Sequence, residues 1–76
     1  MGIHIAIRKM RENLRAADYE FVFGGTPGLL RLDKRTGTTL LIDVDPADEM
    51  AFRCAARKLR KHWLRGEVPD RTSWAA

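Results

Sequence analysis

The chain has 76 residues, 45% hydrophobic and 32% charged, with a formal net charge of +4, so it holds one small core near the lower size limit for independent folding. It has no apolar run near the roughly 18 residues of a membrane span, and its N-terminus mixes isoleucine with arginine too early for a secretory signal. The single cysteine, Cys54, excludes a disulfide framework and a multi-cysteine zinc site, so we expect a cytoplasmic protein without a cofactor.

Residues 3–17 fit two structures. A strand is indicated by the alternation of Ile3, Ile5 and Ile7. A helix is indicated by five apolar residues within one narrow arc: Ile3, Ile7, Met10, Leu14 and Ala17. The helix accounts for more of the segment and is our prediction. Three arginines would then form a basic stripe on its flank: Arg8, Arg11 and Arg15.

Three strands are predicted next, because the pattern changes to period two and is interrupted by glycine-rich turns. The strands cover residues 19–23, 29–33 and 38–44, with turns at 24–28 and 33–37. Tyr19, Phe21 and Phe23 would share one face of the first of these strands, with Glu20 and Val22 on the other.

Residues 45–66 carry the strongest signal, that of an amphipathic helix of about five turns. Asp45 is placed to cap the N-terminus, Pro46 suits the first helical position and Gly66 suits the stop. The apolar arc comprises Ala51, Phe52, Ala55, Ala56, Leu59 and Trp63, with Cys54 and Ala47 at its edge. The opposite side is basic: Arg53, Arg57, Arg60 and Lys61.

The predicted fold class is therefore α+β: a helix, a three-stranded antiparallel meander and a second helix, with both helices on one face of the sheet. Residues 1–66 would form a single domain and residues 67–76 an irregular tail. An open sheet face with apolar residues indicates a homodimer or a host-protein complex, unless the tail covers that face. The candidate protein-interface residues are Val22, Leu29, Leu41 and Trp74. Trp74 would either fold back on the domain or anchor a partner.

Residues Leu14–Val22, followed by Gly24 and Gly25, are similar to the helix-to-strand passage of the HicA toxin family. The resemblance spans roughly residues 10–60 and implies the double-stranded RNA-binding fold. HicA-type RNases carry a histidine just after the glycine that ends the first strand, whereas this chain reads Gly25-Thr26-Pro27-Gly28. The second helix of double-stranded RNA-binding domains begins with a lysine cluster, whereas here it begins with acidic residues: Asp45, Asp48 and Glu49. The family's catalysis and binding mode therefore do not transfer.

Catalytic chemistry has little support in the residue pattern. Asp43 and Asp45 could hold Mg²⁺ at a strand end, but Asp45 already serves as a cap and no lysine follows at nuclease-like spacing, so we predict no metal site. His4 and His62 lie far apart in the chain without a nucleophile at a telling spacing. We expect no enzyme.

The leading hypothesis is a non-enzymatic binding module that contacts nucleic acid or a nucleoprotein through the arginine-rich helix faces, because guanidinium groups suit phosphate. An acidic protein surface is the related alternative partner. A second hypothesis is a small phage or mobile-element inhibitor, of the anti-defence type, that occludes a host protein. A third is an inactive toxin-like or toxin–antitoxin component.

Overall fold

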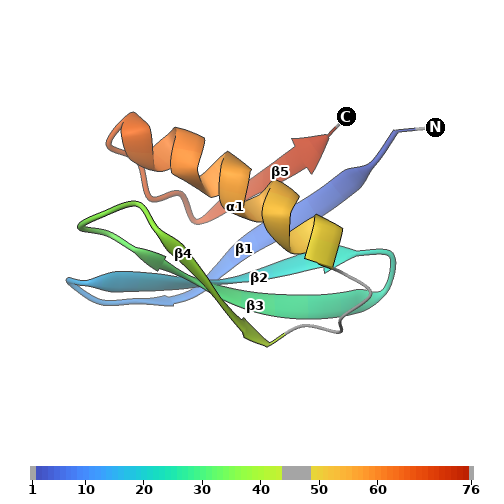
Figure 1. Cartoon of the computed structure of the whole chain (residues 1–76), viewed down its shortest axis with the longest axis horizontal. Helices are drawn as coiled ribbons and strands as arrows, with labels where there is room; N and C mark the ends of the chain where they lie inside the picture. The colour runs from blue at the N-terminus through green and yellow to red at the C-terminus, as the bar shows by residue number, and fades with distance from the viewer. Residues whose placement is uncertain (1, 44–48, 76) are drawn as a thin grey trace.

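The computed structural model describes residues 2–43 and 49–75, and in these ranges it consists of an antiparallel sheet covered on one face by a helix (Figure 1). The elements are β1 (His4–Glu12), β2 (Ala16–Phe23), β3 (Thr26–Asp33), β4 (Thr39–Asp43), α1 (Glu49–Leu64) and β5 (Arg71–Ala75). The order in the sheet is β4-β3-β2-β1-β5, so the helix is followed by a strand at the edge opposite to β4. The predicted order of helix, three strands and helix is wrong: the fold is mostly sheet, with five strands and one helix among the described residues.

The segment predicted as the first helix forms β1 instead. Ile5 and Ile7 are 0% and 2% exposed on its helix-facing side, as the rejected strand pattern required. The alternation breaks near Met10, because the register of β1 against β2 shifts between Lys9 and Arg11. Met10 and Leu14, which had favoured the helical interpretation, are exposed. Two exposed apolar residues therefore gave a strand segment the apolar spacing of a helix.

The central meander is as predicted, because β2, β3 and β4 are consecutive antiparallel neighbours. The main differences are that β2 begins at Ala16 rather than at Tyr19 and that the first turn is shorter than expected. Pro27 and Gly28 belong to β3, and Gly28 lies opposite Phe21, whose ring occupies the space that a side chain at position 28 would fill. A glycine read as a turn residue thus makes room for an aromatic ring in the core.

The C-terminal helix is confirmed in its buried face and in its stop signal. Ala51, Ala55 and Leu59 are fully buried against the sheet. Gly66 has φ +78°, its N–H donates to the carbonyl of Trp63, and the next N–H donates to the carbonyl of His62, both at 2.9 Å. This pair of hydrogen bonds is the Schellman helix ending. The predicted cap at Asp45 lies outside the described residues.

The expected irregular tail contains β5, which pairs antiparallel with β1 from His4↔Ala75 to Arg8↔Arg71. Trp74 lies opposite Ile5 and packs against the core, so β5 completes the hydrophobic layer beneath the helix. Before β5, the hydroxyl of Tyr19 donates to the carbonyl of Pro69 at 2.6 Å. Non-local pairing thus gives order to a segment whose composition shows little strand character.

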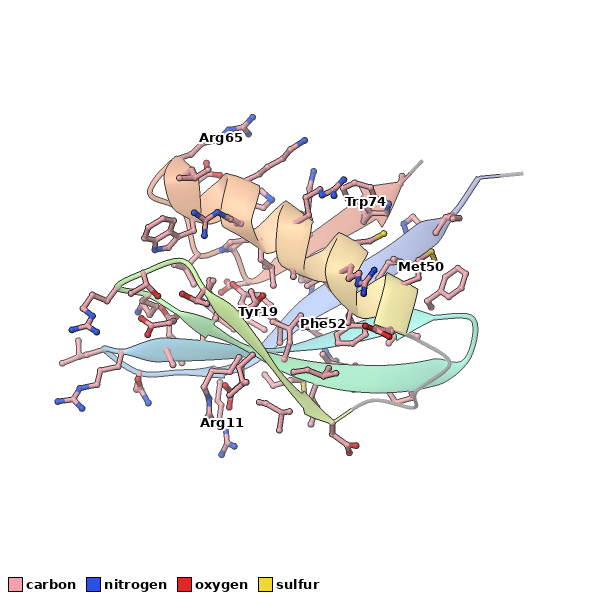
Figure 2. All side chains as sticks on the ribbon, in the orientation of Figure 1. Arg11, Tyr19, Met50, Phe52, Arg65 and Trp74 are labelled. Carbon is pink, nitrogen blue, oxygen red and sulfur yellow. The ribbon has the colours of Figure 1, made fainter. Side chains whose placement is uncertain are left out.

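The sheet has two different faces. Tyr19 and Phe21 are buried on the helix side, and Phe23 packs against the same core, as the alternation predicted. Figure 2 shows Tyr19 and Phe52 between sheet and helix, whereas Arg11 lies on the opposite side of the sheet. We call that opposite side the open face. It carries the second set of alternating residues and no described element covers it.

Candidate nucleic-acid interface

Positive charge is concentrated on α1. This helix contains five lysine and arginine residues against one acidic residue, Glu49, which gives a formal charge of +4. The remainder of the chain contains nine basic and nine acidic residues and is therefore neutral. The whole formal net charge of the protein thus resides in 16 residues of helix.

The basic side chains of α1 face away from the sheet. Arg53, Arg57, Arg60 and Lys61 are all exposed, while the buried residues of the helix lie on the other side. Residues four apart fall on the same helix face, about 6 Å apart along the axis. Arg53, Arg57 and Lys61 therefore form one line, which we call the α1 basic line.

The intramolecular contacts of these cations differ. Arg53 Nη2 lies 3.0 Å from Glu49 Oε1 in an exposed pair, and such pairs contribute little to stability. Arg60 Nη1 donates to the carbonyl of Gly37 at 3.3 Å, and its guanidinium carbon lies 5.9 Å from the ring centroid of Trp63. Within the described ranges, Arg57 and Lys61 make no ion pair or hydrogen bond to another side chain. These two are the cations most available to a ligand.

Arg65, which is not among the residues predicted to bind nucleic acid, extends the α1 basic line just beyond the end of the helix at Leu64. It follows Lys61 by four residues, and Figure 2 shows it directed away from the sheet at the C-terminal end of the helix. Arg65 follows the same four-residue spacing in the sequence. Because it directly precedes Gly66, where the helix was expected to stop, it was not counted with the basic side of the helix.

The other predicted basic stripe does not exist as a unit. Arg8 and Arg11 lie on β1 at the open face, and Arg15 lies in the connection between β1 and β2. Because the sheet separates the open face from α1, Arg8 and Arg11 cannot share a contiguous surface with the α1 basic line. The seven arginines and lysines predicted for nucleic-acid binding thus divide into four on the helix and three elsewhere.

On the open face, two carboxylates are paired with arginines within the chain. Asp18 is 6% exposed and accepts from Arg31 Nε at 2.8 Å, Arg31 Nη2 at 3.1 Å and Arg11 Nε at 2.9 Å. The hydrogen bonds from Arg31, more than those from Arg11, lower the pKa of Asp18 below its ordinary value of 3.8 and outweigh the opposing effect of burial. Arg8 and Glu20 form a longer contact of 3.4 Å.

The predicted protein-interface residues also separate. Val22 and Leu29 lie on the open face, whereas Leu41 and Trp74 pack against the core on the helix side. Three exposed aliphatic residues of the open face were missed: Met10, Leu40 and Ile42, which are 49%, 64% and 44% exposed. All three alternate with residues on the helix side, and the bulges at Lys9/Arg11 and opposite Leu29/Leu30 bring the next residues, Arg11 and Asp43, to the open face as well.

His62 has two partners that its sequence position did not reveal. Its Nδ1 lies 2.8 Å from Glu67 Oε1 and its Nε2 lies 2.9 Å from Thr72 Oγ1. Hydroxyl, imidazole and carboxylate in this order also occur in nucleophilic hydrolases. Here they join the end of α1 to the loop after it and to β5, so we assign them a structural role.

The described residues contain neither a cluster of metal ligands nor a helix that could span a membrane. Within 2–43 and 49–75, no three histidine, cysteine, aspartate or glutamate side chains gather where they could hold a metal ion. Asp45, a candidate ligand with Asp43, lies outside these ranges. In the same part of the chain, no helix is long and apolar enough to cross a membrane.

Comparison with protein-family models, with curated proteins and with solved structures found no match. The helix-first order implied by the resemblance to HicA toxins does not occur, since Leu14 lies between β1 and β2 and residues 16–23 are strand.

Proposed function

We propose that this protein binds the phosphate backbone of nucleic acid through the outward face of α1. The observation that carries the proposal is that the entire formal net charge lies on this helix, with Arg57 and Lys61 unpaired among the described residues. A concentrated basic stripe on one helix is the electrostatic footprint expected of such binding. The cytoplasmic location expected from the lone cysteine would give the protein access to nucleic acid.

The charge pattern also predicts the mode of binding. The line of Arg53, Arg57, Lys61 and Arg65 has the spacing to contact three or four phosphates, and contacts of this kind position a protein without reading base sequence. Glu49 stands at the N-terminal end of α1, so the contact is expected toward the middle and the C-terminal end of the helix. Affinity should therefore depend strongly on salt and weakly on sequence.

Salt dependence provides the direct test. Binding to a fluorescent DNA duplex, an RNA duplex and a single strand is measured by anisotropy between about 50 and 200 mM salt. Neutralisation of three or four phosphates predicts that affinity for a duplex falls by about 40- to 150-fold over this range. No binding at the lowest salt concentration would contradict the proposal.

Charge reversal locates the surface. Arg57→Glu with Lys61→Glu should abolish binding, because both cations become repulsive to phosphate. Arg60 is left intact, since it also contacts Gly37 and Trp63. The matched control is Arg15→Glu with Arg71→Glu, which makes the same change in charge at exposed positions away from the α1 basic line. Equal loss of binding in the control would show that net charge, rather than the helix face, is responsible.

A further inference from the structure

The open face carries a cluster of aliphatic side chains that the fold does not use. Leu40 and Ile42 come from β4, Leu29 from β3 and Met10 from β1, and we call these four residues the aliphatic strip. Met10, Leu29 and Ile42 line one shallow hollow together with Arg11 and Asp18. Leu40 lies beside this hollow, opposite Arg31 in the register of β3 and β4.

The charges around the aliphatic strip are nearly balanced. The open face carries four arginines and three carboxylates: Arg8, Arg11, Arg31 and Arg71 with Asp18, Glu20 and Asp43. Asp18 is neutralised by Arg11 and Arg31, and Glu20 contacts Arg8. Because Asp18 and Glu20 are already paired within the chain, a partner can cover these two carboxylates without leaving them unpaired, and the nearly neutral face attracts a polyanion less than α1 does.

We propose that the occupant of this face is a second copy of the chain, packed sheet against sheet across the aliphatic strip. A two-fold pairing places the same patch on both sides, so the strip of one copy covers the strip of the other. Oppositely charged residues around the strip allow the rim of the patch to complement itself. The result is a four-layer arrangement in which the two α1 helices lie on the outside.

The available area suits a reversible dimer. The five strands of the sheet lie about 4.8 Å apart and rise about 3.3 Å per residue, which gives the open face an area of about 500 Å². Two such faces packed together bury about 1,000 Å² in total. This area is near the lower limit for specific association and above most lattice contacts. It also adds a second apolar layer to a chain near the lower size limit for independent folding. We therefore expect a dimer that dissociates on dilution.

The test is the oligomeric state in the absence of nucleic acid, so that it is independent of the proposed function. Sedimentation equilibrium between about 5 µM and 1 mM should give a mass that rises from one chain of 8.7 kDa toward twice that value. Leu40→Glu should weaken association at least about tenfold, because it introduces a charge into the aliphatic strip. The side chain is already 64% exposed, so the fold should be retained and can be verified by circular dichroism.

A matched control exists on the other side of the molecule. Leu64 is 66% exposed at the end of α1, and Leu64→Glu should leave association unchanged. Concentration-dependent NMR shifts in the wild-type protein should map to Met10, Leu29 and Ile42. A wild-type chain that stays monomeric at about 1 mM would assign the strip to a different partner and overturn the proposal. Equal weakening by both variants, or shifts confined to α1, would overturn it as well.

Discussion

At the scale of single residues, the packing of Trp63 depends on the absence of a side chain at Gly37. Gly37 has φ +76°, a backbone conformation that side chains with a Cβ rarely adopt. A Cβ placed there would lie 2.4 Å from Trp63 Cε3. Trp63 Nε1 also donates to the carbonyl of Lys34 at 2.8 Å. The turn between β3 and β4 is thus attached to the last turns of α1 by one ring.

Gly37→Ala should therefore destabilise the protein by about 2–4 kcal/mol, since backbone strain and displacement of a packed ring act together. Urea unfolding followed by circular dichroism measures the loss. Gly24→Ala is the matched control, because Gly24 has φ +78° but no heavy atom within 4 Å of the added Cβ. Its cost should be only about 1–2 kcal/mol. Equal costs for the two variants would show that the contact with Trp63 adds nothing.

At the scale of elements, the connection between α1 and β5 is held in place by side-chain contacts from β1 and β2. Lys9 Nζ lies 2.6 Å from Glu12 Oε1 and 3.0 Å from Asp70 Oδ1, and these two contacts raise the pKa of Lys9, that with Glu12 more than that with Asp70. The buried hydroxyl of Tyr19 donates to the carbonyl of Pro69, and its burial raises its pKa to about 12. These bonds hold β5 in register against β1.

Trp74→Ala should destabilise folding by about 3–5 kcal/mol rather than release a partner, because Trp74 packs against the core from β5. Tyr19→Phe, which keeps the ring and removes one hydrogen bond, should cost about 1 kcal/mol. Thermal and urea unfolding give both values. Hydrogen exchange should show the Tyr19 variant opening first at residues 71–75. Unchanged stability of Trp74→Ala would refute the core role assigned to β5.

At the scale of the whole molecule, charge is divided between two surfaces. The α1 basic line presents cations without carboxylate partners at Arg57 and Lys61 among the described residues, whereas the sheet carries ion pairs that belong to the fold. The α1 basic line is therefore suited to an anionic ligand, whereas the open face can be covered by a second copy of the chain. It also predicts how stability responds to acid, because the paired carboxylates titrate abnormally.

Between about pH 4.5 and pH 7 stability should vary little, and it should fall as the pH drops below that range. The pKa of Asp18 is lowered, mainly by hydrogen bonds from Arg31, and the pKa of Glu12 is lowered to about 2 by hydrogen bonds from Lys34 and Lys9. A carboxylate with a lower pKa in the folded state stabilises that state above its unfolded pKa, and this contribution is lost as protons bind. Urea unfolding between pH 2 and pH 7 measures the dependence.

The substitution Asp18→Asn measures how much Asp18 contributes to the pH dependence of stability. It should cost about 1–3 kcal/mol at pH 7, because three hydrogen bonds to cationic donors are weakened or lost. The difference from the wild type should narrow as the pH falls toward 2, since the wild-type carboxyl then becomes neutral as well. A difference that stays constant with pH would show that the charge of Asp18 does not contribute.

Local sequence patterns were sufficient to predict α1, its buried face and the central meander. Each rests on local signals: the 3.6-residue period, Gly66 at the helix end, the alternation of Tyr19, Phe21 and Phe23, and the glycine-containing turns before and after β3. The basic side of α1 followed from the same period. Local hydrogen bonding and side-chain direction along one element are sufficient to define such features.

The structure of the two ends of the chain and the composition of the open face depend instead on contacts between distant segments. β5 is a strand because it pairs with β1, from His4↔Ala75 onward, and its own residues show no clear alternation. In β1 the alternation of Ile3, Ile5 and Ile7 is present, but it is too short to decide between strand and helix without the pairing partners. The bulge near Met10 further hid the alternation in β1, and the bulge in β4 accompanies the exposure of Ile42 on the open face. Whether a terminal segment becomes a strand depends on which strand is available beside it for pairing, and this depends on the entire fold.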